Sequence, residues 1–129
     1  MKTLLTIFFL FTFTAIHAQD TPAPVQKKFE MKTYYLVFLK KGPHRDQDST
    51  TMANIQEGHM AHLNKMHDLG KMCIAGPLMD DGDIRGICVY VTETIEEATR
   101  LVNEDPAIKS GRLVAEIHPW YAAKGSKLL

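Results

Sequence analysis

The order in which strand and helix patterns follow one another is the feature that most constrains the fold of this chain. Residues 32–39, "KTYYLVFL", are apolar on both alternating faces, which is typical of a strand buried on both sides. An amphipathic pattern over residues 49–69 predicts a helix. After it, "KMCIA" and "GICVYV" predict two strands of an antiparallel hairpin, with Asp81-Gly82 as the strongest turn signal.

Capping residues mark the ends of the predicted helices. Asp48 or Ser49 can cap the first helix, and Gly70 can adopt the left-handed conformation that ends it. Thr94, followed three residues later by Glu97, predicts a capping box at the start of a second helix. The apolar face of that helix is formed by Ile95, Ala98, Leu101 and Val102.

The second helix is expected to end before Asp105-Pro106, and "RLVAEIHPW" at 112–120 predicts a last strand. The order strand, helix, strand, strand, helix, strand predicts an α+β, ferredoxin-like βαββαβ fold. Its four strands form one antiparallel sheet, with both helices on one face. The first and third predicted strands are apolar on both sides, so we expect a second copy to cover the other face of the sheet in a homodimer.

The N-terminus predicts export. Residues 1–18 contain Lys2, an apolar run over 4–16 and a small residue, Ala18, at a plausible cleavage point, as in a signal peptide. A retained membrane anchor is the alternative, but the run is shorter than the roughly 20 residues that span a bilayer. Residues 19–31 are polar and predict a disordered linker. We therefore expect a secreted or periplasmic protein.

The length of the chain after residue 31 and the charge of the whole sequence limit the classes of partner that the protein is expected to bind. Residues 32–121 are enough for one compact domain, and residues 122–129 form a short C-terminal tail. The 15 Lys and Arg side chains balance 15 Asp and Glu, with no basic block. This balance gives no electrostatic support for nucleic acid or an acidic membrane as a partner, so small molecules and protein are the expected partners.

The two cysteines, Cys73 and Cys88, lie in strand-like segments. In an exported chain they could form a cross-strand disulfide if the hairpin turn centres near Asp80-Asp81. The competing interpretation is two buried free thiols. Their spacing is not that of a metal site, and we expect no metal and no cofactor.

A histidine lies at the centre of the apolar stripe of the first helix. At about 100° per residue, His59 lies at the mean direction of the stripe, whereas His62 and His67 lie on its shoulders. The other members of the stripe are Met52, Ile55, Leu63 and Met66. Burying an imidazole without a partner costs on the order of 1 to 3 kcal/mol, so a polar group must approach it. A core histidine bonded to backbone and a metal ligand shared with His62 are the alternatives to a functional residue.

Three segments together resemble the YciI-like, or YCII-related, domain family over about residues 32–120. They are "HMAHLNKMHDLGKMCIAGPLMDDGDIRG", "ETIEEATRLVNEDPAIKSG" and "EIHPW". The resemblance implies a ferredoxin-like fold that pairs as a dimeric α/β barrel, with a pocket whose suspected catalytic residues are a His and an Asp. By position these are His59 and Asp105. Gln56 departs from the family, which often has Arg there, and the signal peptide is unusual in it.

The resemblance does not define a reaction, although a few similar proteins act on small enolic or aromatic ring metabolites, including by elimination of chloride. We expect general acid–base chemistry of lyase or isomerase type, in which His59 transfers the proton and Asp105 orients the His59 ring. His62, Gly76 and Pro77 are expected to bind substrate, the last two by shaping the pocket wall. Two alternatives are an exported dimer that binds a small ligand without chemistry and a purely structural role, in which Asp105 only ends a helix.

Overall fold

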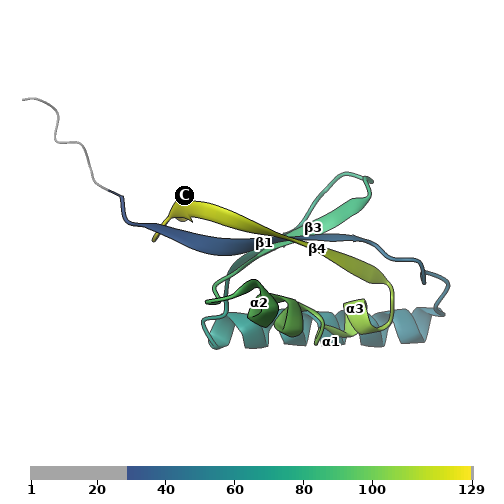
Figure 1. Cartoon of the computed structure of the whole chain (residues 1–129). Helices are drawn as coiled ribbons and strands as arrows, with labels where there is room; N and C mark the ends of the chain where they lie inside the picture. The colour runs from purple at the N-terminus through teal and green to yellow at the C-terminus, as the bar shows by residue number, and fades with distance from the viewer. Residues whose placement is uncertain (1–28, 129) are drawn as a thin grey trace, which may run out of the picture.

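The computed structural model describes residues 29–128 and shows the expected ferredoxin-like fold (Figure 1). The predicted signal peptide and most of the predicted linker lie outside these residues. The elements are β1 (Met31–Lys41), α1 (Ser49–Asp68), β2 (Met72–Pro77), β3 (Ile84–Tyr90), α2 (Ile95–Val102), α3 (Pro106–Lys109) and β4 (Leu113–Ala123). The antiparallel sheet has the order β2-β3-β1-β4, and the helices lie together on one of its faces.

The core lies between the sheet and the helix layer. Tyr35, Val37 and Leu39 alternate along β1, face the helices and are buried. Met66 from α1 and Val102 from α2 pack against them and are fully buried. On the neighbouring strand β3, the three β1 residues pair in this order with Tyr90, Cys88 and Gly86. The alternation seen in the sequence therefore corresponds to one strand face in the core.

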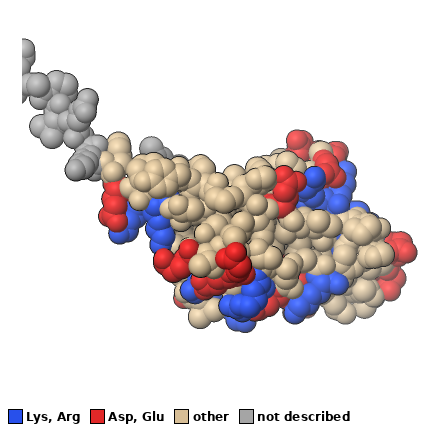
Figure 2. All heavy atoms as spheres, viewed as in Figure 1, with Lys and Arg blue, Asp and Glu red and all other residues tan. Residues whose placement is uncertain are grey.

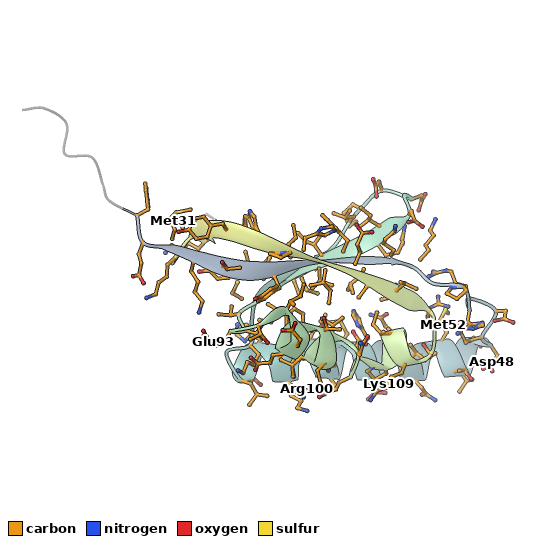
Figure 3. All side chains as sticks on the ribbon, in the orientation of Figure 1. Met31, Asp48, Met52, Glu93, Arg100 and Lys109 are labelled. Carbon is orange, nitrogen blue, oxygen red and sulfur yellow. The ribbon has the colours of Figure 1, made fainter. Side chains whose placement is uncertain are left out.

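The predicted capping signals act as expected. The Asp48 carboxylate accepts a hydrogen bond from the Thr51 N–H at 2.9 Å, which starts α1 (Figure 3). This bond holds the pKa of Asp48 below its ordinary value. Gly70 follows the helix with a φ of 66°, a left-handed conformation that glycine adopts without strain. At α2, the Thr94 side chain accepts from the Glu97 N–H at 3.2 Å.

The structure adds a helix that the sequence analysis did not predict. Asp105 and Pro106 follow α2, as expected, but they also begin the one-turn helix α3. Asp105 is its N-cap and Pro106 its first residue, a position where the missing N–H of proline costs nothing.

α1, the longest helix, is not apolar enough to span a membrane, nor is any other helix among residues 29–128.

The cysteines are both free thiols, so the disulfide alternative is wrong. A register shift between Met72 and Ile74 puts Cys73 in a bulge, and Cys88 pairs with Ala75 instead. A shift of one residue turns a strand side chain to the other face, which is why the pairing failed. Cys88 is buried, which raises the pKa of its thiol to about 12, whereas Cys73 is exposed.

The outer face of the sheet carries apolar and aromatic side chains. Tyr34, Leu36 and Phe38 alternate along β1 on this face and are half-buried. The Tyr34 ring centre lies 6.3 Å from that of Trp120 on β4, which is 43% exposed. In Figure 2, much of the upper surface, where this face lies, has no charged side chains. β4 continues to Ala123, beyond the predicted domain end at residue 121.

Replacing Gly42 by Ala should destabilise the fold sharply. Gly42 follows β1, and its N–H donates to the Arg112 carbonyl at 2.9 Å. A Cβ on Gly42 would overlap the Gly111 carbonyl oxygen, a backbone atom that cannot move alone. We expect Gly42→Ala to lower the free energy of unfolding by about 3 kcal/mol in urea denaturation. The control is Gly76→Ala, whose Cβ would meet no atom within 4 Å; equal stability of the two variants would contradict this packing.

Candidate active site

The central feature of the site is a buried contact between His59 and Asp105. His59 Nδ1 lies 2.7 Å from Asp105 Oδ2, and the side chains are only 11% and 4% exposed. The other oxygen of Asp105 accepts the Ala107 N–H at 2.8 Å. Because an ionised carboxylate only accepts hydrogen bonds, Nδ1 of His59 carries the proton. The tautomer of the neutral imidazole is then fixed, with its lone pair on Nε2.

A glycine inside α1 allows the two partners to meet. Gly58 precedes His59, and a Cβ there would lie 2.9 Å from Cγ of Pro106. The bare backbone lets α1 approach α3 closely, so that the carboxylate capping α3 reaches the imidazole on α1. Gly58 was not among the predicted site residues, although a glycine within a helical pattern costs stability and signals a packing requirement.

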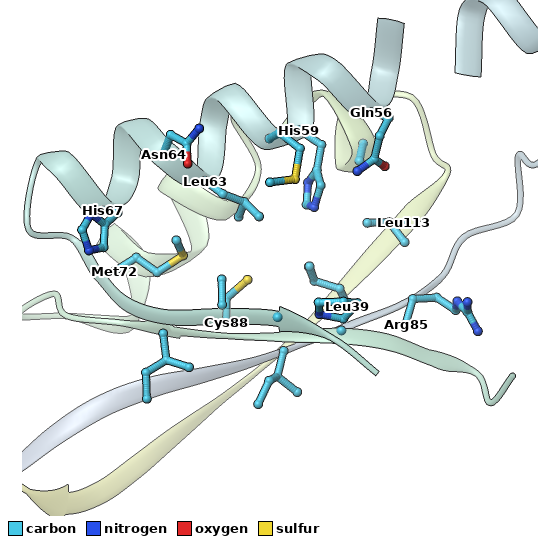
Figure 4. Close-up of a pocket in the computed structure, with 18 of the residues that line it drawn as sticks. Leu39, Gln56, His59, Leu63, Asn64, His67, Met72, Arg85, Cys88 and Leu113 are labelled. Atoms are coloured by element: carbon cyan, nitrogen blue, oxygen red, sulfur yellow. The ribbon is translucent and has the colours of Figure 1, made fainter. Parts of the chain in front are cut away.

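The second ring nitrogen of His59 faces a cavity between α1 and the β2 side of the sheet (Figure 4). The cavity volume is about 810 Å³, and His59 is one of its lining residues. Nε2 has no hydrogen-bond partner among residues 29–128. Every buried polar side-chain atom of this region has a partner, so Nε2 is not one of the buried atoms. Nε2 is therefore open to the cavity.

Small residues create the space beneath His59. The sheet pairs Met72 with Tyr90 at one end and Pro77 with Gly86 at the other. Met72 and Gly86 both line the cavity, and Gly86 has no side chain to occupy it. Gly76 and Gly86 also approach closely, since a Cβ on Gly86 would lie 2.9 Å from the Gly76 carbonyl oxygen. Gly76 and Pro77 thus line the cavity, as expected.

His62 is placed differently from the other expected site residues. It is buried and does not line the cavity. Its Nε2 lies 3.4 Å from the Tyr90 hydroxyl, a partner that the sequence analysis did not anticipate. Burial lowers the pKa of His62, so the ring is neutral at neutral pH and behaves as a core histidine. In the part of the chain that the structure describes, no three His, Cys, Asp or Glu side chains converge as metal ligands would.

The fold and the site together define an α+β protein with a His–carboxylate pair at the wall of a cavity sized for a small molecule. The YCII-related domain model matches residues 12–121, and the chain belongs to this family. A similar solved structure is the 5-chloro-2-hydroxyhydroquinone dehydrochlorinase from Burkholderia phenoliruptrix AC1100, in complex with 2,5-dihydroxybenzoquinone. The TM-score is 0.52 at 21% identity, over 67% of this chain and 92% of that chain, which supports the fold. The comparison with curated proteins found no match.

Adding a methyl group at Gly58 should separate helix propensity from site geometry. Gly→Ala inside a helix normally stabilises by about 1 kcal/mol. Here the methyl group would push against Pro106, so we expect Gly58→Ala to bring no gain in the free energy of unfolding. In a Pro106→Ala background most of the gain should return, because Cγ of the ring is gone and only Cβ, at 3.2 Å, remains in contact with the methyl group. A denaturant double-mutant cycle measures this coupling, and equal gains in both backgrounds would contradict it.

Proposed function

We propose that this protein is a small-molecule enzyme that uses His59 and Asp105 for general acid–base catalysis. The observation that carries the proposal is the open Nε2 of His59, held in one tautomer by the buried Asp105 carboxylate. The cavity volume of about 810 Å³ is typical of small-molecule sites, which measure roughly 300–1,000 Å³. Ser126 is the serine among its described lining residues, and the Ser126 hydroxyl forms no hydrogen bond to a basic side chain of the kind that activates a nucleophile.

The reaction we propose is a proton transfer of lyase or isomerase type. Nε2 of His59 takes a proton from a carbon next to a carbonyl, or from an enol hydroxyl, and the resulting imidazolium is stabilised by the Asp105 carboxylate. The imidazolium then returns the proton to a second position or to a leaving group. A small enolic or ring metabolite has the acidic proton that this chemistry needs. The similar dehydrochlorinase is named for a hydroxylated ring compound of this kind, 5-chloro-2-hydroxyhydroquinone.

We also propose that the protein is a homodimer, paired through the outer face of the sheet as an α/β barrel. Leu36 and Phe38 expose apolar surface there. The charged groups of the face neutralise each other within one chain. Glu116 contacts Lys40 at 3.2 Å and His118 at 2.8 Å. Covering a face with paired charges costs less than covering one with isolated charges.

Export of the protein is a further part of the proposal. Its support is the sequence of residues 1–18, which has the charged, apolar and small-residue regions of a signal peptide. In this proposal, the enzyme acts on a metabolite outside the cytoplasm.

Replacing His59 should abolish catalysis without unfolding the protein. We expect His59→Gln to lower the rate of tautomerisation of a small enol, such as the enol of oxaloacetate, by at least about 100-fold. Asp105→Asn should also lower the rate, because an amide facing Nδ1 favours the opposite tautomer of His59. The rate is measured from the decrease of the ultraviolet absorbance of the enol with time. His44→Gln, an exposed histidine outside the cavity, is the matched control. A parental rate in His59→Gln would refute the role, and ligand binding without turnover would favour a binding protein.

A charge placed on the outer face of the sheet should separate the two copies. Leu36→Glu puts an additional carboxylate in the middle of the proposed interface, opposite His118, which already contacts Glu116. Light scattering should give twice the mass of one chain for the parent and the mass of one chain for this variant. Ala61→Glu, on the exposed side of α1, is the control and should stay paired. A parent that scatters as a monomer would contradict the dimer.

A further inference from the structure

The charged side chains that line the cavity are all of one sign. Among residues 29–128, three arginines line it and no Asp or Glu does. We propose that the site takes substrates that carry a carboxylate, and that Arg45, Arg85 and Arg112 bind this group. The inference rests on the proposed function, because it names the substrate class of the same site. Lys127 adds a fourth positive charge to the lining.

The fold brings the three arginines to one end of the cavity. Arg112 directly precedes Leu113, which pairs with Lys41 at the end of β1. Arg85 lies at the neighbouring end of β3, where the register shifts between its two flanking residues. It is therefore the extra residue of a bulge, which turns its side chain out past the end of the sheet (Figure 4). Arg45, in the loop before α1, donates through Nη1 to the Arg112 carbonyl at 3.0 Å.

The positive charge of these arginines is not compensated within the described chain. Nη1 of Arg85 donates to the carbonyl oxygens of Asp80 and Gly82, at 3.1 and 3.4 Å. The Arg112 guanidinium lies 3.0 Å from Oε1 of Gln47 and 3.1 Å from Sδ of Met52. All of these partners are neutral. Among residues 29–128, no carboxylate forms an ion pair with Arg45, Arg85 or Arg112.

An arginine outside the cavity does have an acidic partner. Arg100, on the solvent side of α2, pairs with Glu104 at 2.7 Å (Figure 3). The Asp105 carboxylate lies behind His59 and is already bound by the imidazole and by a backbone N–H. An anion entering the cavity thus meets several guanidinium groups and, in the described lining, no competing carboxylate. A guanidinium presents paired N–H donors that match the two oxygens of a carboxylate.

The rest of the lining suits the body of such a substrate. Gln56 lies one turn before His59 on α1, so it stands between the imidazole and the helix end that Arg112 contacts. Leu39, Ile55 and Leu63 supply apolar wall. A carboxylate held by the arginines would leave the ring or enol carbon of the same molecule against this wall, on the side of Nε2. Nearby positive charge also stabilises the enolate that proton abstraction creates.

Matched acids and esters test the carboxylate directly. The probes are 2,5-dihydroxybenzoate and acetoacetate, each against its methyl ester, titrated into the full mature protein by calorimetry. We expect each acid to bind at least about tenfold more tightly than its ester. Arg112→Gln and Arg45→Gln should each weaken acid binding by about tenfold and leave ester binding within about twofold. Arg112→Lys keeps the charge and should recover part of the loss. Arg100→Gln is the matched control and should change neither.

The outcomes separate this inference from the proposed function. If an ester binds as tightly as its acid, or if neither acid binds at millimolar concentration, the inference is overturned. Turnover of an ester that depends on His59 would then still support the enzyme. If the acids bind through the arginines but show no turnover that His59→Gln removes, the carboxylate site stands and the proposed catalysis fails.

Discussion

The hydrogen bond between His59 and Asp105 is the interaction on which the candidate site depends. It joins two side chains 46 residues apart at 2.7 Å in the interior of the domain. Removing one partner of this buried hydrogen bond leaves the other polar group without compensation, at a cost of about 1–3 kcal/mol. The pair therefore ties α1 to α3. It also determines which nitrogen of the imidazole faces the cavity.

The fold was largely predictable because its signals are local. Asp48 begins α1 through a hydrogen bond to a residue three positions away, and Gly70 follows its end with a left-handed backbone conformation. The alternation along β1 depends only on the side chains of that strand. The features that failed depend on register. The bulge at Cys73 follows from how β2 meets β3 and displaced the expected cysteine pair. α3 was missed because Asp105-Pro106 is equally typical of the end of one helix and the start of the next.

The site was predictable only where a residue conflicts with its pattern. His59 was found because an imidazole sits where an apolar side chain belongs, and Asp105 only through the family resemblance. His62 shows the limit of this approach, since its angle on the helix did not reveal that Tyr90 would be its partner. The arginines of the cavity gave no signal at all. Each lies in a different segment, and only the tertiary fold brings them to one end of the sheet.

The cavity follows from the unequal size of the side chains under α1. Met72 lines one part of the cavity with a large side chain, whereas Gly76 and Gly86 line it without one. A larger side chain at Gly86 would collide with the backbone of the adjacent strand, so strand packing itself keeps this end of the core open. The same glycine that lets β2 and β3 lie close thus leaves Nε2 of His59 facing open space. Core packing and access to the imidazole are consequences of one local constraint.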